Sequence, residues 1–171
     1  MSAEQALVRQ AIAADAGAIA AIFAQYVTSS VVTFEEIPPT DGQWRDRLAG
    51  LAGSGLPVLV AELVNAVAGY AYASPWRPKP AYRRTVEDTV YLAPESRGHG
   101  LGRLLLDALL EACGAAGVHQ VIAVIADTGD PASVALHRRC GFTDAGRLSE
   151  VGHKHGRWVD TILLQRTLGP P

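Results

Sequence analysis

The sequence predicts a mixed α/β domain in which helices cover both faces of a single sheet. Three observations support this class. Apolar residues recur at helical spacing between Ile19 and Val27, and short apolar runs of strand length, such as residues 121–126, lie between helical segments. The predicted order of elements is β-α-α-β-β-β-α-β-α-β-β, which is typical of a mixed sheet. With 171 residues, 49% of them hydrophobic, we expect a single domain over residues 1–171.

Composition excludes several classes of protein. The apolar content excludes intrinsic disorder, and 15 basic against 17 acidic residues give no overall electrostatic footprint of a nucleic-acid binder. Cys113 and Cys140 form no C-x-x-C pair, so we expect two free, buried thiols in a reducing compartment. No apolar run approaches the ~18 residues of a spanning helix, and residues 1–5 lack a basic segment. We therefore expect a cytoplasmic protein with no membrane and no nucleic-acid partner.

The first helix is predicted from capping and periodicity. A short strand ends near Ile12, and Asp15 is a good N-cap because its carboxylate can accept a hydrogen bond from an orphan backbone N–H. Pro38 and Pro39 then interrupt the chain before a second helix around residues 44–51. One face of the first helix is apolar and consists of Ile19, Ile22, Phe23, Tyr26 and Val27.

The remaining elements follow from apolar runs and turn residues. Asp130-Pro131 predicts a helix start, with Asp130 as N-cap, and Gly141 its end. The turn around Gly156 separates the last two strands. The predicted elements are strands at 58–63, 66–73 and 85–92, a helix at 101–113, a central strand at 121–126, a helix from 130, and strands at 145–151 and 158–168.

A glycine-rich loop joins the strand at 85–92 to the following helix. Glycines there allow a close approach of the backbone to a phosphate, and N–H groups at the helix start face it. The loop lacks the Lys of a P-loop, and counting from Gly98 a dinucleotide fingerprint would need glycine at Arg103. What fits is R-x-x-G-x-G, at Arg97, Gly100 and Gly102. By itself this pattern is also compatible with a tight strand-to-helix turn.

In its context the loop resembles the acetyl-CoA loop of the GNAT superfamily of N-acetyltransferases. A second segment, D-P-A-S from Asp130 to Ser133, followed by Leu136-His137 and then Gly141-Phe142, is similar to that superfamily's N-x-x-S…L-[YH]-x-x-x-G-F. In that pattern the Asn and the Ser contact CoA. A carboxylate cannot donate as an amide does, so Asp130 either contacts CoA differently or serves as the helix cap.

Four further motifs resemble the phosphinothricin and methionine sulfoximine N-acetyltransferases. They are T-V-E-D-T-V-Y-L at 85–92, A-Y-R at 81–83, T-F at 33–34 and G-x-K-x-G-x-W-x-D at 152–160. The resemblance implies a mostly antiparallel sheet that splays between its two central strands, an acetyl-CoA co-substrate and a homodimer. It also implies acetylation of the amino group of phosphinothricin, methionine sulfoximine or methionine sulfone. A broader range of amino acids or amines, and a CoA-binding regulator without catalysis, are the alternatives.

The resemblance also assigns a cofactor-binding set. It comprises the end of the strand at 85–92, the glycine loop with the start of the helix at 101–113, and the D-P-A-S segment: Val90, Tyr91, Leu92, Arg97, Gly98, His99, Gly100, Leu101, Gly102, Arg103, Asp130 and Ser133. The Leu92 N–H is the candidate donor to the oxyanion. Tyr91 is either a wall of the substrate site or a core residue.

Acetyl transfer to an ammonium group needs a base, and the thiolate leaving group benefits from an acid. Glu87, in a strand suited to burial, is the candidate base; the alternative is a solvated edge carboxylate. Alternation places Glu87 and Tyr91 on one face of the strand and Asp88 on the other, where we expect Asp88 to be solvated. His137 is either the acid or a histidine that joins helix to sheet.

The substrate's carboxylate predicts arginine ligands, because guanidinium binds carboxylates through two parallel hydrogen bonds. Arg77 and Arg83, with Tyr82, lie in the basic loop before the strand at 85–92, and Phe34 is expected to cover the apolar side of the substrate. His153-x-His155 has ligand spacing but no third ligand, so we expect no metal.

Overall fold

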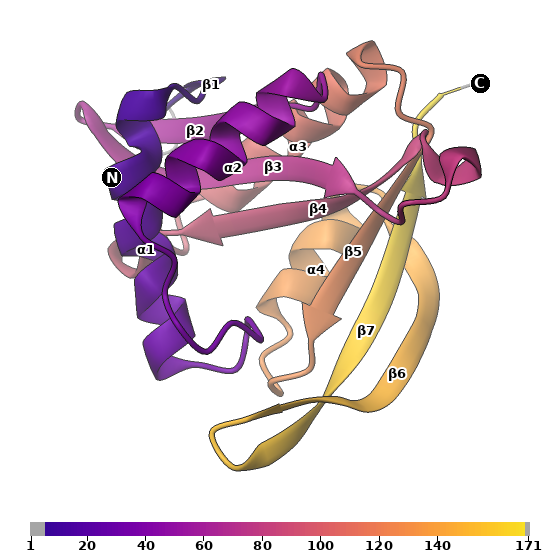
Figure 1. Cartoon of the computed structure of the whole chain (residues 1–171). Coiled ribbons are helices and arrows are strands. Elements are labelled where there is room, and N and C mark those ends of the chain that lie inside the picture. Colours follow the sequence, from indigo (N-terminus) through magenta and orange to yellow (C-terminus); the bar gives the residue numbers. More distant parts are fainter. Residues whose placement is uncertain (1–5, 170–171) are drawn as a thin grey trace.

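The computed structural model describes residues 6–169 and has one open sheet of seven strands, ordered β1-β2-β3-β4-β5-β7-β6 (Figure 1). Only the pairing of β4 with β5 is parallel; the other five are antiparallel. The strands are β1 (Leu7–Gln10), β2 (Val58–Leu63), β3 (Ala66–Pro75), β4 (Thr85–Leu92), β5 (Gln120–Ala126), β6 (Thr143–Lys154) and β7 (Arg157–Thr167). The helices are α1 (Ala16–Ser29), α2 (Asp41–Gly53), α3 (Leu101–Ala115) and α4 (Ala132–Arg139).

Helices cover both faces of the sheet, as predicted. Helices α1 and α2 bury an aromatic core against β2, β3 and β4, with Phe23, Trp44 and Tyr70 in edge-to-face contacts. On the other face α3 presents a fully buried leucine stripe that includes Leu105 and Leu109. Burial of one such leucine contributes about 1.5–3 kcal/mol, so the stripe fixes α3, and with it the loop that precedes α3.

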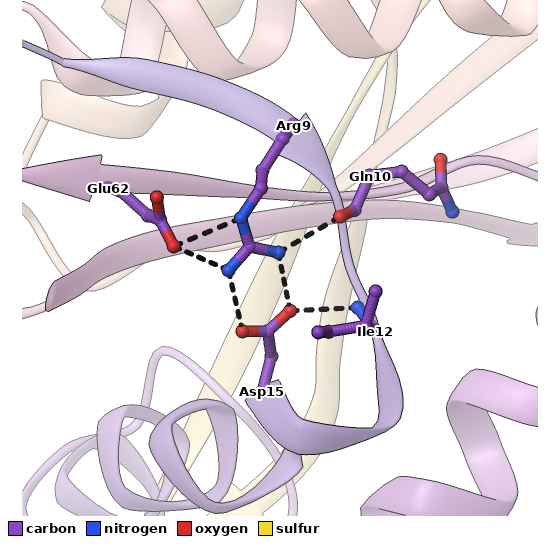
Figure 2. A network of polar contacts seen from close by, with 5 residues as sticks. All are labelled: Arg9, Gln10, Ile12, Asp15 and Glu62. Carbon is purple, nitrogen blue, oxygen red and sulfur yellow. Dashed lines mark hydrogen bonds and ion pairs between the residues drawn. The ribbon is translucent and has the colours of Figure 1, made fainter. Parts of the chain in front are cut away.

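The start of α1 corrects one sequence prediction. Asp15 holds the predicted N-cap position of α1, but its side chain makes no capping bond to that helix. Its carboxylate instead accepts from both terminal nitrogens of Arg9, at 2.8 and 2.9 Å, and from the Ile12 N–H at 2.8 Å (Figure 2). Arg9 also donates to Glu62 of β2, at 3.0 Å from Nε. The charge-assisted contact with Arg9 outweighs capping and ties β1, β2 and the entry to α1 together.

The start of α4 lies later than predicted. Pro131 is the N-cap residue and Ala132 the first helical one, although Asp130 Oδ1 still accepts from the Ala132 N–H at 2.9 Å. Gly141, at φ +84°, ends the segment as predicted.

β6 is longer than the predicted strand at 145–151, whereas β7 lies one residue earlier than the predicted strand at 158–168. The pairing continues through Gly152–Val159 and Lys154–Arg157, around a two-residue turn at His155 and Gly156. Both turn residues have positive φ, of 50° and 73°, which matches the right-handed twist of a hairpin. Gly152 lies inside the ladder, paired with Val159.

The central strands separate as the family resemblance implies. β4 pairs with β5 only over three positions, from Thr85–Gln120 to Glu87–Ile122, whereas β5 pairs with β7 over its whole length. Beyond these three pairs the two strands diverge (Figure 1). Both cysteines are free and buried, as expected. Within residues 6–169, no helix has the length and hydropathy to cross a membrane.

Candidate active site

The splay leaves backbone groups of β4 without a ladder partner. The Ala93 N–H donates to the Ala68 carbonyl on the β3 side at 2.8 Å. Because antiparallel bonding alternates along a strand, the N–H and C=O groups of Val90 and Leu92 face the opposite side, toward the gap. Unpaired groups inside a sheet cost free energy unless something binds them, so the gap is suited to a ligand with amide and carbonyl groups.

Side chains alternate along β4 as predicted. Tyr91 lies on the α1 face, where its ring packs against Phe23 and Tyr26 at centroid distances of 5.2 and 5.1 Å. Half-buried Glu87 shares this parity. Burial raises the pKa of Glu87, the negative charge of Asp88 raises it further, and the positive charge of Arg77 opposes them. The geometry therefore gives β4 a carboxylate whose basicity is raised above that of a solvated glutamate.

Asp88 is buried, which corrects the prediction that it is solvated. It is the first residue beyond the last β4–β5 pair, and α4 places His137 against it. His137 Nε2 lies 2.9 Å from Asp88 Oδ2, and His137 Nδ1 lies 2.7 Å from the Ser133 carbonyl oxygen. Both partners are acceptors, so the contacts favour an imidazolium. Burial lowers the pKa of His137, but the hydrogen bond and charge of Asp88 outweigh it, and the pKa is raised.

Neither ring nitrogen of His137 is left to face the gap. His137 is buried, and its side chain bridges α4 to the vertex of the splay. This arrangement favours the alternative in which His137 joins helix to sheet over the alternative in which it is the acid.

The glycine loop fits a phosphate-bearing ligand. Gly98 and Gly100 have φ of +79° and +81°, and a Cβ added at Gly98 would meet no atom within 4 Å. Open space therefore lies over the loop, at the N-terminus of the 15-residue helix α3. Leu101 is fully buried, so its side chain belongs to the core and is not available to a ligand. Gly102 permits close helix packing, since a Cβ there would lie 3.2 Å from Leu136.

A cavity of about 590 Å³ lies beside the loop, between α1, the start of α4 and the β6–β7 hairpin. Its walls include the predicted residues Arg97 and Asp130. They also include Tyr26, His155 and Arg157, which sequence reasoning did not assign to the site. Tyr26 falls within the apolar helical pattern and gives no separate signal in the sequence.

The predicted carboxylate ligands gather in a second pocket of about 290 Å³. Arg77, Tyr82 and Arg83 line it together with Lys79. The Arg77 guanidinium stacks over the Trp76 ring at 4.8 Å, and Arg83 Nη1 donates to the Pro80 carbonyl at 3.3 Å. The structure thus unites three of the four predicted substrate residues.

Phe34 lies apart from that pocket, against the β6–β7 hairpin. A Cβ added at Gly152 would lie 2.2 Å from Cζ of the Phe34 ring, so the ring rests on the glycine backbone. Lys154, 3% exposed, donates from Nζ to the Thr33 carbonyl at 2.9 Å. Burial lowers the pKa of Lys154, and the charges of Glu36 and Glu35 oppose this. The hairpin therefore holds the T-F segment in place.

The comparisons with known proteins identify the family. The model of the acetyltransferase (GNAT) family matches residues 19–142. The chain belongs to the GNAT acetyltransferase family. The predicted family and mixed α/β fold are confirmed.

Three relatives illustrate the match. A phosphinothricin N-acetyltransferase of Alcaligenes faecalis is 49% identical over 154 residues, covering 90% of this chain and 78% of that protein. An L-methionine sulfoximine/L-methionine sulfone acetyltransferase of Pseudomonas paraeruginosa is 39% identical, covering 96% of both proteins. The crystal structure of a phosphinothricin acetyltransferase from Sinorhizobium meliloti, in complex with acetyl-CoA, superposes with a TM-score of 0.92 at 46% identity, covering 96% of this chain and 89% of that one.

Proposed function

We propose that this chain is an acetyl-CoA-dependent N-acetyltransferase, one domain over residues 1–171, that acts on the amino group of a small L-amino-acid analogue. Phosphinothricin, methionine sulfoximine and methionine sulfone are the proposed acceptors, supported by the activities named for its relatives. The observation that carries the proposal is β4, in which half-buried Glu87 precedes the Leu92 N–H that faces the splay. Acetylation of phosphinothricin predicts resistance to it in cells.

Different cofactor-binding residues would bind different parts of acetyl-CoA. Backbone N–H groups of residues 98–103 would hold the pyrophosphate, with Arg97 beside it, and Val90 and Leu92 would bind the pantetheine arm along the gap. Asp130, which lines the cavity beside the loop, and Ser133, in the first turn of α4, would bind the co-substrate from the α4 side. Acetyl-CoA supplies an activated acetyl group and a thiolate leaving group.

Two groups of β4 serve the chemistry. Glu87 removes the proton of the substrate ammonium, directly or through a water, and its raised pKa brings its basicity closer to neutral pH. The Leu92 N–H donates to the acetyl oxygen, where negative charge develops. Since amino groups titrate at about 8–10, the base is needed at neutral pH.

Recognition of the acceptor requires its carboxylate to be paired. Arg77 and Arg83 are the proposed ligands, and Tyr82 completes their pocket. Phe34 is the proposed apolar wall. A regulator without catalysis would require neither this basic pocket nor Glu87. Broader specificity toward amino acids or amines remains an alternative that an acceptor panel decides.

We also propose a homodimer built on the β6–β7 hairpin. Leu148, Val151 and Trp158 are 46%, 52% and 62% exposed on this extended arm. A second copy of the chain would cover them. Sedimentation equilibrium should give twice the chain mass, and Trp158→Ser should yield monomer; a monomeric wild type rejects the dimer. A cytoplasmic location stays a sequence-based prediction.

The proposal is tested by thiol release with a panel of acceptors, using wild type, Glu87→Gln and the control Glu111→Gln on the exposed side of α3. We expect Glu87→Gln to lower kcat at neutral pH by about 10²–10⁴-fold, with a smaller loss as pH rises and the amine becomes neutral. Glu111→Gln should match wild type. Wild-type kcat in a folded Glu87→Gln variant excludes Glu87 as the base, and no release with any acceptor rejects the function.

A further inference from the structure

Tyr26 of α1 makes the polar contact at the open end of β4. Its hydroxyl donates to the Leu92 carbonyl at 2.5 Å and accepts from Arg97 Nε at 3.2 Å. The Arg97 guanidinium also lies over the Tyr26 ring, 5.1 Å from its centroid. One side chain therefore contacts both the splayed strand and the cofactor loop.

The contact decides how Leu92 faces the gap. The peptide group between Leu92 and Ala93 is held at both ends, because Tyr26 binds its C=O and the Ala68 carbonyl accepts its N–H. In a strand, the N–H and C=O of one residue point the same way. Tyr26 satisfies the carbonyl that lost its ladder partner and leaves the Leu92 N–H directed into the gap.

The second contact of Tyr26, with Arg97, concerns the phosphate end of acetyl-CoA. Arg97 is exposed on the loop that precedes α3, and Tyr26 and Arg97 both line the 590 Å³ cavity. A long arginine side chain loses rotamer freedom on binding, and prior fixation by Tyr26 reduces that cost.

We propose that Tyr26 is a positioning residue for acetyl transfer, whose hydroxyl orients Leu92 for the acetyl group and Arg97 for the phosphate end of acetyl-CoA. The inference rests on the proposed roles of the Leu92 amide and of Arg97. It extends the site to α1, which the motifs do not include.

Tyr26→Phe tests this with a matched control, Tyr70→Phe. Tyr70 belongs to the same aromatic core, and its buried hydroxyl has no partner among residues 6–169. Removal of an oxyanion donor costs about 10²–10³-fold in kcat, so its misorientation in Tyr26→Phe should cost about 10–100-fold. We expect the KM for acetyl-CoA to rise several-fold and the KM for the amino acid to stay unchanged. Tyr70→Phe should keep wild-type kinetics.

Kinetic constants of Tyr26→Phe equal to wild type, or an equal loss in Tyr70→Phe, would overturn the proposal. A Tyr26→Phe variant that fails to fold while Tyr70→Phe folds would make Tyr26 structural, and would also overturn it. The contact between Tyr26 and Arg97 is tested by a second measurement. The acetyl-CoA affinity is compared among Tyr26→Phe, Arg97→Gln and the double variant. The two losses should be less than additive; additive losses contradict the link.

Failure of the proposed function has a different signature. It would appear as a wild type without acceptor-dependent thiol release. In that case the role of Tyr26 is tested by titration calorimetry with acetyl-CoA, which does not depend on an acceptor. Weaker acetyl-CoA binding by Tyr26→Phe than by Tyr70→Phe supports the positioning role, and equal acetyl-CoA affinity of the two variants overturns it.

Discussion

The buried ion pair of Asp88 with His137 predicts how much free energy of unfolding is lost when one partner is removed. The side chains are 1% and 6% exposed, and Asp88 Oδ2 lies 2.9 Å from His137 Nε2. Asp88→Ala removes the acceptor and leaves a buried imidazole with an unpaired nitrogen. Removal of one partner of a buried ion pair costs about 3–5 kcal/mol. At about 2–4 °C per kcal/mol for a chain of this size, the Tm should fall by roughly 6–20 °C.

Two variants calibrate that loss. Asp88→Asn keeps the volume, and its amide can donate to Nε2 of a neutral His137, so it should cost much less than Asp88→Ala. Asp144→Ala breaks a contact of the same length, 2.9 Å to Arg138, between side chains 65% and 56% exposed. Exposed pairs contribute about 0–1 kcal/mol, so this control should leave Tm nearly unchanged.

Urea denaturation at several pH values separates charge from packing. The folded-state pKa of His137 is raised, so the stability that Asp88 contributes through charge is fully present below the ordinary histidine pKa of about 6.5 and is lost as pH rises through the raised value. The difference between wild type and Asp88→Asn should therefore narrow from pH 6 toward alkaline pH. An Asp88→Ala variant within 1 kcal/mol of wild type, or a difference from Asp88→Asn that is independent of pH, would refute the ion pair.

Three further predictions concern backbone and surface positions. Gly100→Val, at φ +81°, should strain the loop and weaken acetyl-CoA binding in calorimetry; unchanged affinity in a folded variant argues against acetyl-CoA binding by the loop. Gly152→Ala places a Cβ 2.2 Å from the Phe34 ring and should therefore raise the KM for the amino acid but not the KM for acetyl-CoA. A raised KM for acetyl-CoA with an unchanged KM for the amino acid would contradict the assignment of Phe34 to the acceptor site. Arg9→Leu removes charge-assisted contacts and should cost about 1–3 kcal/mol in urea denaturation at neutral pH. That cost should shrink in acid as Asp15, whose pKa Arg9 lowers, becomes protonated; a constant difference would contradict it.

Patterns along the chain are sufficient to predict much of this protein. The strands at 58–63 and 85–92 lie where their apolar runs predict them, because a strand's periodicity is local. The glycine loop is also local, since positive φ at Gly98 and Gly100 needs no distant partner. The splay of the central strands agrees with what the family resemblance implies, and the clustering of Arg77, Tyr82 and Arg83 agrees with their closeness in the sequence.

Partnerships between distant residues were decided only in the tertiary structure. Asp88 alone in the sequence resembles a solvated carboxylate, and it is buried because α4 brings His137 from 49 positions away. Asp15 has the pattern of a helix cap, but Arg9 binds it more strongly. In the sequence, Tyr26 looks like one of several core residues. Only the fold brings its hydroxyl to the carbonyl of Leu92, which lies 66 positions further along the chain. Hydrogen bonds and ion pairs depend on distances of a few ångströms, and local periodicity fixes no distance between segments that meet only in the folded chain.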